Sequence, residues 1–214
     1  MKKIIKRKIP IIKVELDEYK DDFVFKEDSN SISFKTLEDE ELIDKDKYRI
    51  VFDTCRVKNT RFNDNTFYRS EFIDVVFENC DLSNNTFDNC IFIRCEFISC
   101  KLLGSTFYNS AISDVLIEVS IAKYVVFAEN KIKSLELVHS SFEESSFFEN
   151  DLKNITLDDV NFKKATFSET KLKDVDLSTC NIENIKIDHK SVEGAIISLF
   201  QAESICYLLG VRIK

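Results

Sequence analysis

The sequence predicts an all-β protein whose chain winds into a stack of four-sided coils. An apolar residue stands at every fifth position from Phe52 to Ile187, in one unbroken phase. A helix repeats about every 3.6 residues and a flat strand about every 2, so neither produces this spacing. A second period of 20 groups the fives into coils of four, because Phe recurs at that interval. It does so at Phe67, Phe87, Phe107, Phe127, Phe147 and Phe167. Successive coils are then expected to stack about 4.8 Å apart.

A second register, two residues before each apolar centre, holds mostly small or β-branched side chains such as Ser70 and Val115. One large and one small inward residue per five would fill a narrow interior and leave three residues for solvent. The chain has only 3 Gly and 1 Pro, so the corners are expected to use Asn, Asp and Ser, which tolerate turn dihedrals. Residues 121–124, around the weak centre Ala122, are the expected site of any local distortion.

Three segments are expected. Residues 1–50 form an N-terminal extension and cap, with 23–50 closing the first coil, because an open coil exposes its core and unpaired backbone. Residues 51–189 form the repeat body, about seven coils of 20 residues. Residues 190–214 form a C-terminal helix and short strand, in which Ser198 and Gln201 resemble a capping box.

The C-terminal helix has more apolar residues than the end of one small coil needs. We therefore expect it to form a homodimer interface as well as a cap. The expected interface residues are Leu199, Ala202, Ile205, Cys206, Leu209, Val211 and Ile213.

The period of five, with a large residue at the centre of each five, resembles the pentapeptide-repeat family over about residues 50–189. This resemblance implies a right-handed quadrilateral β-helix. The tail is similar to the C-terminus of the Qnr and MfpA group, in Gly194-Ala195-Ile196-Ile197, Gln201-Ala202, Leu209-Gly210-Val211 and Ile213.

The tail resemblance implies a homodimer that mimics DNA and binds a type II topoisomerase, either DNA gyrase or topoisomerase IV. It would protect that enzyme from fluoroquinolones or modulate their action. Loops that interrupt the coil in Qnr proteins of Gram-negative plasmids have no counterpart in this unbroken phase. The loopless chromosomal Qnr-like proteins of Gram-positive bacteria are therefore the nearer comparison.

The net charge of −8 lies entirely in residues 51–189, where 23 acidic residues face 15 basic ones. Two of the four walls carry most of the acids, and these are the expected partner-binding residues. The wall centred on Val57 and its equivalents carries Glu78, Glu96, Glu118, Glu136, Asp158, Asp159 and Asp176. The wall of the Phe series carries Asp88, Glu129, Glu149 and Glu169.

Carboxylates repeated at every coil would present a negative array comparable to the phosphates of duplex DNA. The alternative is a solvated acidic surface that maintains solubility. The sign of the charge disfavours direct binding of nucleic acid. A second function class also remains, a structural scaffold that binds an unrelated protein partner.

The sequence predicts no enzyme, metal or cofactor. Six of the 7 Cys occupy the small inward register, which favours reduced packing residues over zinc ligands. His139 and His189 fall on different walls, and no Gly-rich phosphate loop is present. The odd number of Cys and the lack of an export signal or a membrane-spanning stretch predict a cytoplasmic protein with no membrane partner.

Overall fold

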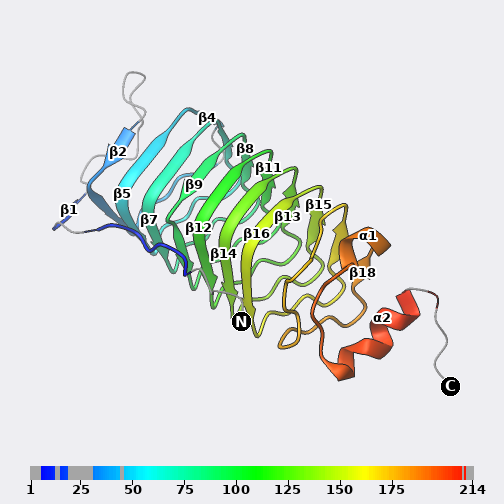
Figure 1. The fold of residues 1–214 in the computed structure, drawn as a ribbon. Coiled ribbons are helices and arrows are strands. Elements are labelled where there is room, and N and C mark those ends of the chain that lie inside the picture. The colour runs from blue at the N-terminus through cyan, green and yellow to red at the C-terminus, as the bar shows by residue number, and fades with distance from the viewer. Residues whose placement is uncertain (1–5, 13–14, 19–30, 44–45, 209, 211–214) are drawn as a thin grey trace.

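The computed structural model describes residues 6–12, 15–18, 31–43, 46–208 and 210. They form a four-sided parallel β-solenoid of about 8 turns, seen from the side in Figure 1. We number its sides in chain order. Wall 1 carries Phe52, wall 2 Val57, wall 3 Phe62 and wall 4 Phe67, each with its equivalents 20 residues apart. The predicted quadrilateral β-helix is confirmed.

Walls 1 and 2 share a 10-stranded sheet. Its long strands turn the corner between the two walls, and its short strands lie on one wall each. The long strands are β5 (Val51–Lys58), β7 (Glu71–Glu78), β12 (Ala111–Glu118), β14 (Lys131–Val138) and β16 (Asp151–Asp158). The short strands are β1 (Asp17–Glu18), β2 (Ser31–Ser33), β3 (Lys35–Glu38), β9 (Ile91–Ile93) and β10 (Glu96–Ile98).

Wall 4 is an 8-stranded parallel sheet of short strands. They are β4 (Asp46–Tyr48), β6 (Thr66–Tyr68), β8 (Thr86–Asp88), β11 (Thr106–Tyr108), β13 (Val126–Ala128), β15 (Ser146–Phe148), β17 (Thr166–Ser168) and β18 (Lys186–Ile187). Wall 3 is joined by single parallel bridges such as Arg61 with Asp81. All these pairs are 20 residues apart, so each column of the solenoid repeats one sequence position.

The predicted Phe column of wall 4 is a continuous stack in the core. Ring centroids of Phe107 and Phe127 are 4.7 Å apart with 3° between the planes, and those of Phe147 and Phe167 are 4.6 Å apart with 1°. These distances match the strand spacing of about 4.8 Å, so backbone pairing sets the ring stacking. Neighbouring columns meet edge-to-face, as Phe72 and Phe87 do at 5.8 Å and 83°.

The small inward residues hydrogen-bond one coil to the next. Ser110 Oγ accepts from the Cys90 amide at 2.9 Å and donates to the Phe87 carbonyl at 3.3 Å. The Asn150 amide group likewise donates to the Phe127 carbonyl at 2.9 Å. Buried backbone groups that are left without partners are costly. Short polar side chains therefore recur here because they fit the narrow interior and also satisfy the backbone at the corners.

At nearly every described corner, the residue two positions after the apolar centre has left-handed backbone. Asn84 has φ of 57° and Asn154 has φ of 56°, which confirms the role expected for Asn. Most corners are held by a backbone bond to the next coil, as the Asn59 amide donates to the Glu78 carbonyl at 3.0 Å. The same geometry is imposed on Val119, a β-branched residue with φ of 50°. Left-handed backbone costs a residue other than glycine about 1–2 kcal/mol.

The distortion expected at residues 121–124 is wrong. Tyr124 has the same left-handed φ, 60°, as the other corners, and Ala122 is fully buried. Ile121 pairs in register with Lys101 before it and with Ser141 after it. Backbone pairing on both sides holds the coil, whatever the size of the inward side chain.

The solenoid has one coil more than the seven expected, because residues 31–50 already follow its register. Ile32 pairs with Phe52, Leu37 with Val57, and Lys47 with Phe67. Residues 31–43 and 46–50 of the expected cap thus belong to the first coil, and 23–30 lie outside the described residues. Lys47 occupies an apolar-phase position, which hides the repeat in the sequence.

The C-terminal segment closes the last coil with α1 (His189–Val192), a 3₁₀ turn η1 (Leu199–Gln201) and α2 (Ala202–Leu208). The Gln201 side chain accepts from the Ser198 amide at 2.7 Å and donates to the carbonyls of Leu177 and Cys180 at 2.8 and 2.7 Å. Ile205 is 7% exposed and packs on the core. Among the described residues, no helix is long and apolar enough to cross a membrane.

The sheet of walls 1 and 2 stops at β16, although the coils continue beyond it. Residues 171–178 pair instead with the C-terminal segment, as the Leu177 amide donates to the Ile196 carbonyl at 2.8 Å. Walls 3 and 4 remain paired across this level, through Asn161 with Asn181 and β17 with β18. We call this break the seam. Leu152, Ile155 and Leu157 on β16 are only partly buried there, unlike their equivalents in the preceding coil.

The corner geometry predicts that Val119→Asn stabilises the protein by about 1 kcal/mol, because Asn tolerates left-handed backbone better than a β-branched residue. Val119 is 56% exposed, so the change removes little packing. Urea unfolding followed by circular dichroism measures the difference.

The matched control for this prediction is Asn154→Val, at a corner with φ of 56°. It should lose about as much stability as Val119→Asn gains. Equal stabilities for the wild type and both variants would contradict the explanation from corner strain.

Candidate partner-binding surface

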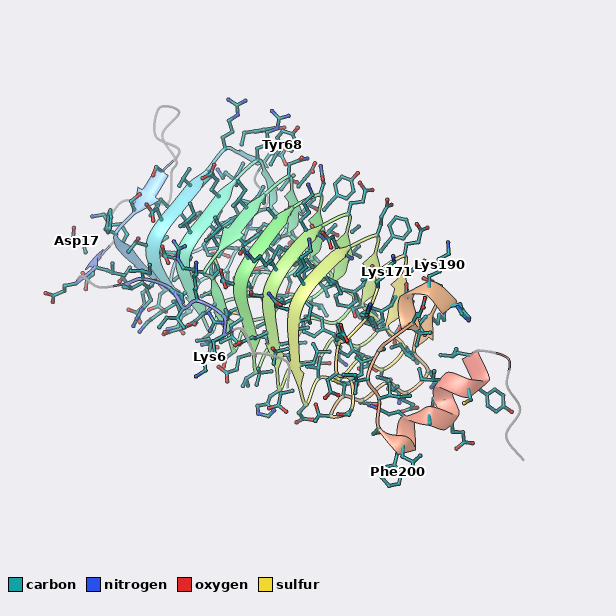
Figure 2. The ribbon with its side chains drawn as sticks, viewed as in Figure 1. Lys6, Asp17, Tyr68, Lys171, Lys190 and Phe200 are labelled. Carbon is teal, nitrogen blue, oxygen red and sulfur yellow. The ribbon has the colours of Figure 1, made fainter. Side chains whose placement is uncertain are left out.

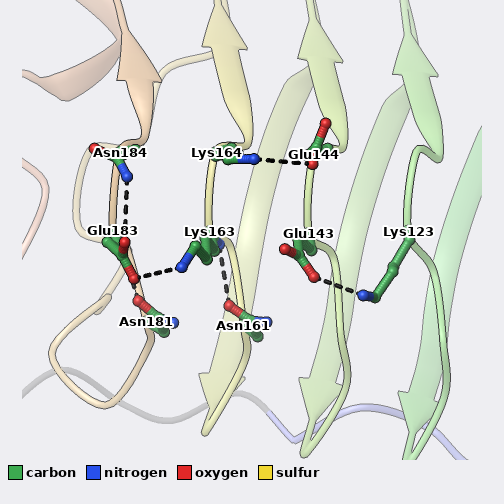
Figure 3. A network of polar contacts seen from close by, with 9 residues as sticks. All are labelled: Lys123, Glu143, Glu144, Asn161, Lys163, Lys164, Asn181, Glu183 and Asn184. Carbon is green, nitrogen blue, oxygen red and sulfur yellow. Dashed lines mark hydrogen bonds and ion pairs between the residues drawn. The ribbon is translucent and has the colours of Figure 1, made fainter.

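Wall 3 is electrically balanced along the rod (Figure 3). Its outward column alternates in sign over four coils, and the four residues form two ion pairs. Lys123 Nζ lies 2.6 Å from Glu143, and Lys163 Nζ lies 2.8 Å from Glu183. The hydrogen bond between Lys123 and Glu143 raises the pKa of Lys123 and lowers the pKa of Glu143. This wall therefore presents little net field to a charged partner.

Wall 2 carries most of the acids expected to bind a partner, but several are already paired. Glu78 lies 3.4 Å from Lys58, and Asp159 lies 3.4 Å from His139. Glu96 and Glu136 both bind Arg7, from the N-terminal segment, at 2.8 and 3.3 Å.

The remaining acids of wall 2 are scattered. Glu118 and Asp158 make no ion pair with any described residue, but they lie two coils apart. Asp176 is exposed and lies on the far side of the seam. The free acidic residues of wall 2 therefore do not form one continuous array.

The corner that follows wall 4 carries the one unbroken row of predicted acids that we find in the described residues. Glu129, Glu149 and Glu169 stand on three successive coils, all exposed, with φ of 58°, 53° and 50°. We call this row the glutamate ladder. None of the three makes an ion pair with a described residue. Tyr108 donates a hydrogen bond to Glu129 at 3.2 Å, and the charge of Glu129 raises the pKa of that phenol.

The glutamate ladder ends near basic residues. Glu169 lines a surface hollow together with Lys171 and Lys190, which lie near each other in Figure 2. Asp88, the remaining predicted acid of this wall, accepts a hydrogen bond from the Asn89 side chain at 2.6 Å. The ladder is therefore bounded on one side by Asn89 and Asn109, in the same column, and on the other by this basic pair.

The C-terminal end carries a second candidate surface, which is apolar. Leu199 is 87% exposed, as the dimer prediction requires, whereas Ile205 is buried against the last coil and Ala202 and Cys206 are half-buried. The expected interface residues Leu209, Val211 and Ile213 lie outside the described residues.

Two prominent residues of this end escaped the sequence prediction. Phe200 is 95% exposed and Tyr207 is 73% exposed, and Figure 2 shows Phe200 projecting from the start of the C-terminal helical segment. Helical spacing selects Leu199, Ala202, Ile205 and Cys206, and Phe200 and Tyr207 lie off that stripe, so the spacing passes over them. The sequence signal that could have identified them is the size of their aromatic rings. Phe200, next to Leu199, places such a ring outside the stripe of residues that helical spacing selects.

The cysteines lie in the core as predicted. Six are buried, and Cys206 is half-buried. Burial raises the pKa of Cys55 to about 11 and of Cys95 to about 12. Within the described residues, no group of three or more His, Cys, Asp and Glu side chains is placed to hold a metal ion.

The sequence matches two profiles of one protein family. The pentapeptide repeat region profile matches residues 70–147, and the profile of 8 pentapeptide repeats matches residues 145–184. Together they span 70–184, which is 115 of the 214 residues. The chain belongs to the pentapeptide-repeat family. No match is found among curated proteins.

Several solved structures are similar to this chain at low sequence identity. A trypsin-treated variant of QnrB1, a plasmid-mediated fluoroquinolone resistance protein, is 16% identical, with a TM-score of 0.44 over 83% of this chain and 99% of that one. Full-length QnrB1 is 14% identical, with a TM-score of 0.39 over 85% and 100%. HetL, involved in heterocyst differentiation regulation in the cyanobacterium Nostoc, is 10% identical, with a TM-score of 0.28 over 80% and 90%.

The buried thiols lead to a chemical prediction. Since the thiolate is the reactive form and must be reached by the reagent, burial should protect all the cysteines except Cys206. A raised pKa adds to this protection at Cys55, Cys90, Cys95, Cys100 and Cys180. A disulfide reagent such as dithionitrobenzoate should modify one thiol quickly in the native protein and the 6 buried ones only as urea unfolds it. Fast native modification of two or more thiols would show that the core is open.

Proposed function

We propose that this protein is a homodimeric DNA mimic that binds a type II topoisomerase and modulates fluoroquinolone action. It acts as an interaction protein without catalysis of its own, and the glutamate ladder is the part of its surface that takes the place of phosphates. The observation that carries this proposal is the row of three carboxylates at successive coils, none of them ion-paired with a described residue. The similarity of the tail to the Qnr and MfpA group supplies the class of partner.

The spacing of the glutamate ladder supports the comparison with DNA. Coils stack about 4.8 Å apart, and one strand of duplex DNA carries a phosphate about every 3.4 Å along the helix axis. Both are rigid rows of exposed negative charge. Three stacked glutamates repel one another, so a surface selected only for solubility gains nothing from placing them in one column.

The neutral wall 3 supports the same interpretation by contrast. There, equivalent positions alternate Lys and Glu and pair across coils. The stacked coil can thus neutralise its outward columns, and it does so on one face while leaving the glutamate ladder open. A DNA-binding groove lined by Lys and Arg would meet this ladder with complementary charge.

The exposed apolar end supports the homodimer. Leu199, Phe200 and Tyr207 are each more than two-thirds exposed and belong to one short segment at the end of the rod. Large apolar side chains that cluster on a surface mark interaction sites. A second copy offers the same patch, so an end-to-end dimer related by a twofold axis would bury both at once.

The ladder proposal is tested by charge reversal. Glu129→Lys, Glu149→Lys and Glu169→Lys together should weaken binding to purified DNA gyrase at least about tenfold, because like charges would then face the groove. Surface plasmon resonance at two salt concentrations measures this, and wild-type binding should fall as salt rises.

The matched control for the ladder carries the same change of total charge on wall 3, in Glu143→Lys, Glu144→Lys and Glu183→Lys. It should bind gyrase within about threefold of the wild type, since the effect depends on location. Equal loss in both triple variants, or no binding by the wild type, would remove the mimicry proposal. The scaffold function, with an unrelated protein partner, would then lead.

The dimer is tested at the exposed end. Phe200→Asp should convert a dimer into a monomer of 24.9 kDa in sedimentation at micromolar concentration, because it places a charge in the centre of the apolar patch. Glu203→Lys, an exposed charge change on the neighbouring helix α2, should leave the dimer intact. A monomeric wild type under the same conditions would overturn the assignment.

A further inference from the structure

Residues 6–12 lie along the outside of the solenoid, and we call them the N-terminal strap. In Figure 1 they form the dark blue trace that crosses the long strands, and their contacts place them at the corner between walls 1 and 2. From Arg7, which contacts Glu136 of β14, the strap runs back to Ile11, which contacts Asp74 of β7, toward the end of the rod where β1 pairs with β3. The strap therefore follows the rod axis, across the coils, and contacts residues up to 129 positions away in the sequence.

Arg7 is the anchor of the strap. Its guanidinium lies 2.8 Å from Glu96 and 3.3 Å from Glu136, and its side chain is only 7% exposed. The two carboxylates belong to one outward column of wall 2, two coils apart, with Leu116 between them. One arginine thus bridges acids that cannot reach each other, a geometry suited to its planar, forked set of donors.

The backbone of the strap is held by a second column, at the corner between walls 1 and 2. The Lys8 amide donates to Asp114 at 3.1 Å, and the Ile11 amide donates to Asp74 at 2.8 Å. Arg94 binds Asp74 with two bonds of 2.6 Å. Burial alone would raise the pKa of Asp74, but the bonds from Arg94 and Ile11 outweigh it, and the pKa is lowered.

The spacing of these contacts matches an extended peptide to the coil repeat. Asp74 and Asp114 are two coils apart, about 9.6 Å. Lys8 and Ile11 are three residues apart, which in an extended chain is about 10 Å. Pro10 between them favours the extended form, because the residue before a proline is restricted to it. Any extended segment with donors at the same interval meets the same carboxylates.

The strap is held by polar contacts rather than by apolar burial. Ile9 and Ile11 are 66% and 48% exposed. Its contacts are one bridging arginine and two amides on carboxylates, so the ion-pair part weakens with salt. Below it, Val76 is buried although it faces outward from the same column as Glu96. Glu96, Glu136, Asp74 and Asp114 with Val76 and Leu116 thus form the strip of surface under the strap, which we call the strap groove.

We propose that the strap groove is a binding site for an extended basic peptide segment, filled in this chain by its own residues 6–12. A basic segment of a protein partner then binds there by exchange with the strap. Recognition consists of an arginine between Glu96 and Glu136 and of backbone amides on Asp74 and Asp114. The exchange with a partner rests on the proposed function, whereas the peptide site does not.

The test uses the full-length chain with Arg7→Glu, which repels the strap from Glu96 and Glu136 and frees the groove. The control is Lys6→Glu, the same charge change on the neighbouring exposed residue. The probe is a fluorescent peptide with the sequence of residues 6–12, followed by anisotropy. It should bind Arg7→Glu at least about tenfold more tightly than the wild type or Lys6→Glu, whose grooves are filled.

A further variant locates the peptide. Glu96→Gln and Glu136→Gln, added to Arg7→Glu, should abolish peptide binding. In the otherwise wild-type chain this pair should speed hydrogen exchange at the Lys8 and Ile11 amides, which gives a readout if Arg7→Glu does not fold. Equal peptide binding by all the proteins, or unchanged exchange at both amides, overturns the proposal.

Gyrase binding separates this inference from the proposed function. If the partner reaches wall 2, Arg7→Glu should bind gyrase more tightly than Lys6→Glu does. If no variant binds gyrase while the peptide still prefers Arg7→Glu, the topoisomerase function fails and the peptide site stands. If gyrase binds but the peptide does not discriminate, the peptide site fails alone.

Discussion

Backbone pairing between coils about 4.8 Å apart is the constraint on which the rest of this structure depends. It sets the ring stacking in the core, with centroids 4.6 to 5.3 Å apart along the wall 4 column. It also forces every outward side chain to stand over another from the same sequence position. Alternating signs in a column give the paired wall 3, and equal signs give the glutamate ladder. The charge pattern on the surface of the rod is thus determined by which charges recur every 20 residues along the sequence.

Much of the fold was predictable because each inward position is decided locally by the phase of the repeat. The Phe column, the cysteines in the small register and the Asn corners all follow from spacing. The first coil was missed where Lys47 occupies an apolar position and hides the phase. The strap groove could not be found in this way, because residues 6–12 lie outside the repeat and contact wall 2 across 89 to 129 residues. The run Lys6-Arg7-Lys8 facing an acidic rod was the one sequence signal for it.

The acidic walls were predicted as two arrays, and the structure divides their residues differently. Spacing alone assigns Glu96 and Glu136 to an exposed row, since it cannot know that Arg7 folds back over them. It also cannot distinguish a corner glutamate that makes no ion pair from one that pairs with a lysine of the next coil. Ion pairing depends on side-chain reach across coils and from the termini.

The seam has a mechanical consequence. A rod bonded on all four sides resists bending equally along its length, but at β16 only walls 3 and 4 carry hydrogen-bonded ladders to the next coil. The bending stiffness is lowest at that section, with the compliant direction toward walls 1 and 2. A load applied at the exposed C-terminal tip is transmitted as a hinge moment to this level. The coils before the seam then move as one stiff body, and the C-terminal end can tilt relative to them. The angle of that tilt depends on what the tip is attached to.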